Sequence, residues 1–179
     1  MNIAFDNRTL RSIENNDAPQ LLSLIERNRA RLTDYFPVTS NEITTLETSR
    51  NYIANKLELA EKREHFCFVV EDANPGLLGL FILKNFDWLV PKCEIAYFID
   101  KDREGKGIMT GALSVLIKYC FEEMSMNKLF IMTATDNLPS RKVAEKNGFE
   151  VEGILRKNFR VPAGGLVDMV YYGLIRNEQ

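Results

Sequence analysis

The sequence is poor in the residues that build metal centres and disulfide frameworks. Its 179 residues include one histidine, His65, and three cysteines, Cys67, Cys93 and Cys120. An odd number of cysteines without metal-ligand spacing excludes a disulfide framework and gives no sign of a metal site. Because each cysteine lies in an apolar segment, we expect buried, reduced thiols, with a catalytic thiol as the alternative. For His65 we expect a structural role.

An excess of one charge and long hydrophobic runs are also absent. The chain has 23 basic and 25 acidic side chains, for a net charge of −2, whereas nucleic-acid-binding domains usually carry a basic excess. No apolar run approaches the roughly 20 residues that cross a bilayer, and the first ten residues lack a signal-peptide pattern. We therefore expect a cytoplasmic protein without a nucleic-acid or membrane partner.

What is present is one uninterrupted series of helical and strand patterns, which predicts a single domain over residues 1–179. Strands are expected at 9–13, 66–70, 77–83, 93–99, 129–133, 149–155 and 167–174, and helices at 17–33, 46–60, 108–124 and 137–147. In 108–124, polar residues recur only every four positions, so this helix should be largely buried against a sheet. The mixed order predicts an α+β fold.

A charged, glycine-rich loop is the sharpest local feature: Arg103-Glu104-Gly105-Lys106-Gly107-Ile108-Met109-Thr110 follows a strand and opens the buried helix. Free N–H groups and the positive end of the helix dipole attract an anion there, and glycines let a phosphate approach the backbone. The sequence is neither a P-loop nor a dinucleotide fingerprint. On its own it fits a phosphate loop or a plain turn equally well.

Four motifs in a fixed order carry a resemblance: Glu94-Ile95-Ala96-Tyr97-Phe98-Ile99, Gly105 to Thr110, Asn137-x-x-Ser140, and Glu145 to Glu150. Together they resemble the GNAT superfamily of N-acetyltransferases, and most closely the branch that acetylates the N-termini of ribosomal proteins. The resemblance covers nearly the whole chain. It implies a GNAT fold, with a central mixed, mostly antiparallel seven-stranded sheet flanked by about four helices, and acetyl-CoA as the co-substrate.

The resemblance also implies where acetyl-CoA binds. The family's pyrophosphate signature, (Gln or Arg)-x-x-Gly-x-(Gly or Ala), aligns with Glu104-x-x-Gly107-x-Met109, so both outer positions depart from it. Met109 still offers its backbone N–H, whereas Glu104 must point away from the phosphates or be offset by Arg103 or Lys106. The expected cofactor-binding residues are Phe98, Ile99, Arg103, Gly105, Lys106, Gly107, Ile108, Met109, Thr110, Asn137 and Lys142.

Glu94 is the expected general base, acting directly or through a water, because the matching glutamate is thought to do so in the family branch. The alternative is a glutamate on an edge strand that faces solvent or pairs with Lys92. Asp168 is the second candidate base or an orienting partner. The expected substrate-binding residues are Trp88, Asp168 and Tyr172.

Ser140 is the expected general acid, because it matches the serine proposed for the ribosomal branch, while the tyrosine that many GNAT enzymes use is replaced by Ala144. A backbone-bonded serine in the first helical turn is the alternative. Asn137 could likewise be a plain helix cap instead of a pantetheine ligand, and Lys142 a solvated charge instead of a 3′-phosphate ligand.

The acceptor is expected to be a primary amine, foremost the α-amine of a ribosomal protein. At pH 7 an α-amine loses its proton at a cost of about 1–1.4 kcal/mol and a lysine at about 4.6 kcal/mol, so one carboxylate suits the former. Three acidic residues expected near the site, Asp87, Glu94 and Asp168, favour a basic protein acceptor. Acetylation of a small amine or antibiotic, a non-catalytic acyl-CoA-binding module, and a homodimer all remain open.

Overall fold

One eight-stranded sheet runs through the molecule in the order β1-β2-β3-β4-β5-β6-β8-β7. The computed structural model describes residues 1–72, 76–162 and 164–176. The strands are β1 (Asn2–Phe5), β2 (Arg8–Ser12), β3 (Phe66–Asp72), β4 (Leu77–Asp87), β5 (Lys92–Ile99), β6 (Lys128–Ala134), β7 (Glu150–Arg160) and β8 (Leu166–Ile175). Every neighbouring pair is antiparallel except β5 and β6, which are parallel.

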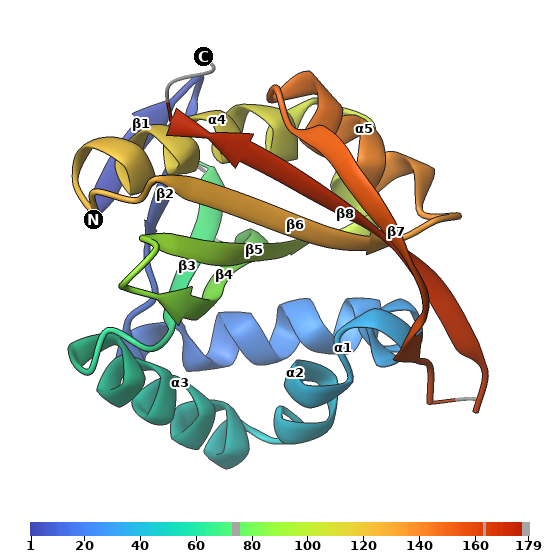
Figure 1. Cartoon of the computed structure of the whole chain (residues 1–179). Helices are drawn as coiled ribbons and strands as arrows, with labels where there is room; N and C mark the ends of the chain where they lie inside the picture. Colours follow the sequence, from blue (N-terminus) through green and yellow to red (C-terminus); the bar gives the residue numbers. More distant parts are fainter. Residues whose placement is uncertain (73–75, 163, 177–179) are drawn as a thin grey trace.

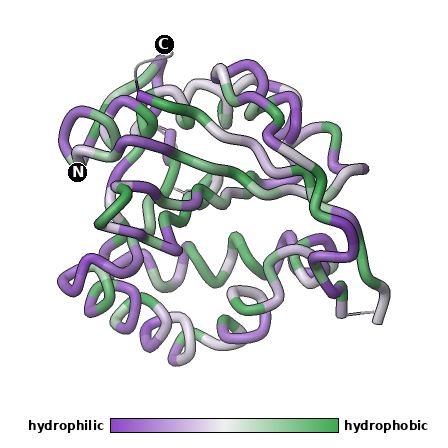
Figure 2. The backbone as a smooth tube through the Cα atoms, viewed as in Figure 1, coloured by the Kyte–Doolittle hydropathy of each residue, from purple (hydrophilic) through white to green (hydrophobic). Residues whose placement is uncertain are grey.

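Helices cover both faces of this sheet (Figure 1). The helices are α1 (Ala18–Tyr35), α2 (Pro37–Glu42), α3 (Leu46–Glu61), α4 (Ile108–Glu122) and α5 (Leu138–Lys146), with short 3-10 turns η1 (Asn15–Asp17) and η2 (Lys101–Arg103). One hydrophobic cluster joins α4 to the sheet, and a second joins α1 and α3 to the opposite face. Hydrophobic residues accordingly concentrate in the central strands and on the inner sides of the helices (Figure 2).

The sequence predicted the α+β class and the buried helix α4, and both are confirmed. Ser114, Lys118 and Glu122 form the exposed stripe of α4, and the three cysteines are free and buried.

The predicted counts of seven strands and about four helices are each one too low. The additional elements are β1, with four residues, and α2, with six; both are too short to show a periodic pattern. No helix in the described ranges is long and apolar enough to span a membrane.

The parallel pair β5 and β6 separates after a short stretch of pairing. Lys92, Cys93 and Glu94 pair with Lys128, Leu129 and Phe130, and no later pair joins the two strands in the described chain. Over its remaining length β6 stays paired with β8, and β5 stays paired with β4. The sheet therefore opens directly after Glu94, in the middle of the molecule.

Candidate active site

Glu94 is held at the point where the sheet opens and is only 3% exposed. Asn85 Nδ2 donates a hydrogen bond to Glu94 Oε2 at 2.6 Å, and Lys84 Nζ lies 3.3 Å from Oε1. Asn85 lies in a bulge of β4 and has φ +54°, and this local bend turns its side-chain amide toward the Glu94 carboxylate. Lys92 pairs instead with Asp87, at 3.7 Å. Glu94 is thus neither on an edge strand nor the partner of Lys92.

A cavity of about 320 Å³ has Glu94 in its wall. Successive residues of a strand point to opposite faces of the sheet; Ala96 packs with the α1–α3 cluster and Tyr97 with the α4 cluster. Both residues line the cavity, as do Asn137 and Ser140 at the start of α5. The cavity therefore passes from one face to the other through the opening between β5 and β6.

A pair of hydroxyl groups, those of Ser140 and Tyr97, lies in this cavity with Glu94. Ser140 Oγ donates to Tyr97 Oη at 3.2 Å, and Tyr97 Oη donates to the Ser140 carbonyl at 3.0 Å. Burial raises the pKa of Tyr97 to about 12, although the Ser140 hydrogen bond lowers it in part. Asn137 caps α5 by accepting the Ser140 N–H at 3.2 Å. Tyr97 was not predicted; its only signal is a hydroxyl inside an apolar strand.

The glycine-rich loop leaves open space in front of the first turn of α4. Gly105 and Gly107 have φ values of +72° and +73°, in the left-handed region that favours glycine. A Cβ added to either would meet no atom within 4 Å. Ile108 and Met109 are buried and anchor the start of the helix, whose first N–H groups have no partner within the helix. The backbone is thus accessible to a phosphate group, and this loop fits a pyrophosphate.

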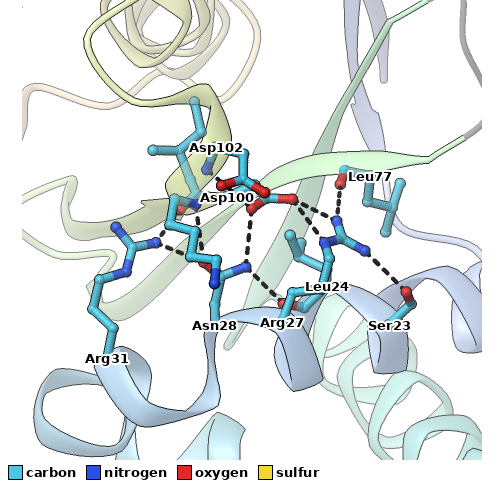
Figure 3. A network of polar contacts seen from close by, with 10 residues as sticks. Ser23, Leu24, Arg27, Asn28, Arg31, Leu77, Asp100 and Asp102 are labelled. Atoms are coloured by element: carbon cyan, nitrogen blue, oxygen red, sulfur yellow. Dashed lines mark hydrogen bonds and ion pairs between the residues drawn. The ribbon is translucent and has the colours of Figure 1, made fainter.

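Helix α1 fixes the beginning of that loop through a buried polar network around Asp100 (Figure 3). Asp100 accepts hydrogen bonds from Arg27 Nε at 2.8 Å, Asn28 Nδ2 at 3.4 Å and the Asp102 N–H at 3.3 Å. Burial would raise the pKa of Asp100, but these bonds outweigh it and lower that pKa. Arg31 pairs with the Glu104 carboxylate. Glu104, the outer position that departs from the signature, is therefore offset by α1.

The wall beyond Glu94 carries basic residues that were not predicted as site residues. Lys56 of α3, His65 before β3 and Lys84 of β4 all line the cavity. His65 Nε2 is buried and has no hydrogen-bond partner in the described part of the chain. Across residues 1–72, 76–162 and 164–176, no group of three or more His, Cys, Asp or Glu residues could hold a metal ion.

Comparison with known proteins shows to which family the chain belongs. The family model of the acetyltransferase (GNAT) domain matches residues 7–150. The chain belongs to the GNAT acetyltransferase family. The "Putative ribosomal N-acetyltransferase YdaF" of Bacillus subtilis (strain 168) is 36% identical over 172 residues, which cover 95% of this chain and 92% of that protein. The expected family and N-acetyltransferase class are thereby confirmed.

Solved GNAT structures share the whole fold. The ribosomal-protein-S5-alanine acetyltransferase from Vibrio fischeri superposes with a TM-score of 0.92 at 26% identity, over 99% of this chain and 98% of that one. The RimL ribosomal L7/L12 α-N-protein acetyltransferase, solved in complex with coenzyme A, gives a TM-score of 0.89 at 21% identity, with 98% of each chain covered.

Within this GNAT fold, the residues expected to bind substrate are not among those that line the Glu94 cavity. Trp88 Nε1 donates to the Arg63 carbonyl at 3.1 Å. Asp168 Oδ1 accepts the Lys157 N–H at 2.8 Å and lines a neighbouring pocket of about 690 Å³ along β7, which shares Asn158 with the Glu94 cavity. Tyr172 is buried under α5, where its hydroxyl donates to Glu145 Oε1 at 2.7 Å. None of these three side chains is brought to Glu94.

The residues predicted to bind the cofactor differ in burial and in their hydrogen-bond partners. Phe98 is buried, with its ring 5.2 Å from that of Phe36. The Ile99 carbonyl accepts a hydrogen bond from Arg31. Lys106 Nζ donates to the Asp102 carbonyl at 3.0 Å. Three further predicted residues lie on helices: Arg103 is half-buried in η2, Thr110 is half-buried in the first turn of α4, and Lys142 is exposed on α5.

Proposed function

We propose that this enzyme transfers the acetyl group of acetyl-CoA to the N-terminal α-amine of a ribosomal protein. The observation that carries the proposal is the single cavity through the opened sheet, which brings the Glu94 carboxylate and the Ser140–Tyr97 hydroxyl pair together. The names of the YdaF relative and of the Vibrio fischeri structure support a ribosomal acceptor. The RimL structure shows that this fold accommodates coenzyme A.

The chain's own residues suit acetyl-CoA, whose acetyl thioester supplies the group to be transferred. The loop backbone from Gly105 to Thr110 would hold the pyrophosphate, with the positive end of the α4 dipole behind it. Lys106 and Arg103 would add positive charge there. The thioester would then enter the cavity from the face where α4 and α5 lie.

Glu94 would take the proton from the amine, directly or through a water. Asn85 and Lys84 fix its two oxygens, so the carboxylate is oriented before the acceptor arrives. Removing a proton from an α-amine at pH 7 costs only about 1–1.4 kcal/mol, against about 4.6 kcal/mol for lysine. A single carboxylate therefore suits an N-terminal acceptor.

Ser140 and Tyr97 would supply the proton to the departing thiol. A free thiol has a pKa of about 8.5, so it needs only a weak acid. Both hydroxyls line the cavity, and either could be the donor. In their 3.2 Å hydrogen bond Ser140 Oγ donates to Tyr97 Oη, so a proton that Tyr97 gives up can be replaced from Ser140.

A screen of acceptors tests the proposal. The enzyme would be mixed with acetyl-CoA and three classes of amine: N-terminal peptides of ribosomal proteins, N-blocked peptides with one lysine, and small polyamines. We expect release of thiol with the first class, and mass spectrometry should place the acetyl group on the α-amine. Acetylation confined to lysine side chains or polyamines would overturn the proposal.

A further inference from the structure

The side of the cavity beyond Glu94 has an unusual balance of charge. Among the described residues that line the cavity, Glu94 contributes the one carboxylate, whereas Lys56 and Lys84 contribute two positive charges. The other two acidic residues expected near the acceptor lie elsewhere. Asp87 accepts the Leu89 N–H at 3.0 Å in the β4–β5 connection, and Asp168 holds the Lys157 N–H. The acidic surroundings expected for a basic acceptor are therefore not found among the described residues that line the cavity.

Lys56 is the positive charge that the protein leaves uncompensated. Lys84 has Glu94 at 3.3 Å, so these two charges largely cancel. Lys56 Nζ lies 4.9 Å above the centre of the Tyr52 ring, and within residues 1–72, 76–162 and 164–176 no carboxylate lies at ion-pair distance from it. A partly buried ammonium group without a counter-ion favours an anionic ligand and opposes a cationic one.

His65 adds an unused hydrogen-bonding atom to the same wall. Its Nε2 is buried without a partner in the described chain, although buried polar atoms are nearly always hydrogen-bonded. Burial, followed by the charges of Lys56 and Lys84, lowers the pKa of His65 to about 4, so the ring is neutral at physiological pH. A ligand that reaches this nitrogen would satisfy a group that the fold leaves unsatisfied.

We propose that Lys56 and His65 form a subsite for a carboxylate of the acceptor, next to the amine that Glu94 deprotonates. The inference rests on the proposed function and narrows its substrate class to protein N-termini with an acidic side chain among their first residues. Lys56 would provide the charge, and His65 would hydrogen-bond the carboxylate or a peptide group beside it. The same positive charge would disfavour polyamines, which carry further ammonium groups along the chain from the reacting primary amine.

Two peptides that differ in one early residue, aspartate or asparagine, test the subsite in the full-length enzyme with acetyl-CoA. We expect the wild type to prefer the aspartate peptide by roughly tenfold in kcat/KM, a ratio that corresponds to about 1.4 kcal/mol. K56Q should bring the ratio close to one, and K56E should invert it. H65A should raise KM for the aspartate peptide. K62Q is the matched control, since Lys62 lies just past the end of α3 and pairs with Glu58; it should keep the wild-type ratio.

The outcomes separate this inference from the proposed function. Equal kcat/KM for the two peptides in the wild type, or an unchanged ratio in K56Q, would overturn the subsite while leaving N-terminal acetylation in place. Acetylation of spermidine with no activity on either peptide would overturn both. K56Q removes only a charge, so it keeps the test decisive if circular dichroism shows that K56E does not fold.

Discussion

The loop from Gly105 to Thr110, proposed to hold acetyl-CoA and called here the donor loop, is built differently from the cavity around Glu94, proposed to hold the amine and called here the acceptor cavity. The donor loop consists of consecutive residues, Gly105 to Thr110, and depends on backbone conformation in an exposed turn. The acceptor cavity collects side chains from α3, β4, β5 and α5; Glu94 in it is buried, and Tyr97 and Ser140 are half-buried. The loop can therefore be disturbed without changing the cavity, and the cavity can be disturbed without changing the loop.

This difference implies that two sets of variants should have separate effects. Changes in the loop should alter the affinity for acetyl-CoA and leave the choice of acceptor unchanged. Changes in the cavity should alter turnover or acceptor choice and leave the affinity for acetyl-CoA unchanged. A variant of either kind that affects both quantities strongly would show that the two regions are coupled.

The largest expected effect is that of Glu94→Gln in the cavity. General base catalysis contributes about 10²–10⁴-fold, so kcat/KM at pH 7 should fall by roughly that factor. The deficit should shrink as the pH rises through about 8, because an α-amine then loses its proton to solvent. Initial rates measured by thiol release from pH 6.5 to 9.5 check this.

Asp168→Asn is the matched control for Glu94→Gln. Asp168 lies outside the Glu94 cavity and binds the Lys157 N–H, so its loss should leave kcat/KM within about twofold of the wild type. A wild-type rate for Glu94→Gln together with a large loss for Asp168→Asn would transfer the role of base to Asp168.

Gly107→Val in the donor loop should abolish the stabilisation by acetyl-CoA. Ligand at 100 times its Kd adds about 2.7 kcal/mol to a folded protein. Gly107 has φ +73°, and a β-branched side chain there would both strain the turn and fill the space in front of α4. Thermal denaturation with and without acetyl-CoA measures the loss.

Gly164→Ala controls for backbone strain. Gly164 also has a positive φ, +98°, with no atom within 4 Å of an added Cβ, but it lies between β7 and β8. This variant should lose some stability and keep the full shift with acetyl-CoA. If it lost the shift as well, the effect of Gly107→Val would reflect strain alone.

The same difference between the regions decides what the sequence could predict. The glycine-rich helix start could be recognised locally, but the pattern alone fitted a phosphate loop and a plain turn equally well, so its assignment to acetyl-CoA came from the family resemblance. Glu94 and Ser140 were predicted from family resemblance, and the structure brings both to one cavity. Sequence patterns could not identify Tyr97, Lys56 and His65 as site residues. Their proximity to Glu94 depends on the separation of β5 from β6 and on where α3 packs. Trp88 was placed near the acceptor from its position in the loop before Glu94, and Tyr172 from its residue type, and neither property determines where a side chain points.

The hydroxyl pair in the cavity should show an intermediate effect. Ser140→Ala and Tyr97→Phe should each lower kcat by roughly tenfold, less than a full general acid contributes, because the remaining hydroxyl or a water can still donate. The Kd for acetyl-CoA should stay the same, since both changes lie outside the donor loop. A double variant distinguishes a relay from independent donors: a loss no larger than that of one single variant indicates that the two hydroxyls act as one unit.

The smallest expected effect is that of Glu104→Gln in the donor loop. The Arg31–Glu104 pair is exposed, with 39% and 48% of the two side chains accessible, and such pairs contribute at most about 1 kcal/mol. Loss of the carboxylate leaves Arg31 as an uncompensated positive charge beside the pyrophosphate loop. The Kd for acetyl-CoA should therefore fall by about two- to fivefold at low salt, which corresponds to about 0.4–1 kcal/mol. At 0.5 M salt the gain in affinity should largely disappear, because screening weakens exposed charges.

Titration calorimetry at both salt concentrations measures the Kd of Glu104→Gln for acetyl-CoA. Glu58→Gln is the control, because it breaks the exposed pair with Lys62 on another helix. A higher Kd for Glu104→Gln would mean instead that the carboxylate is needed to hold Arg31 and the loop in place.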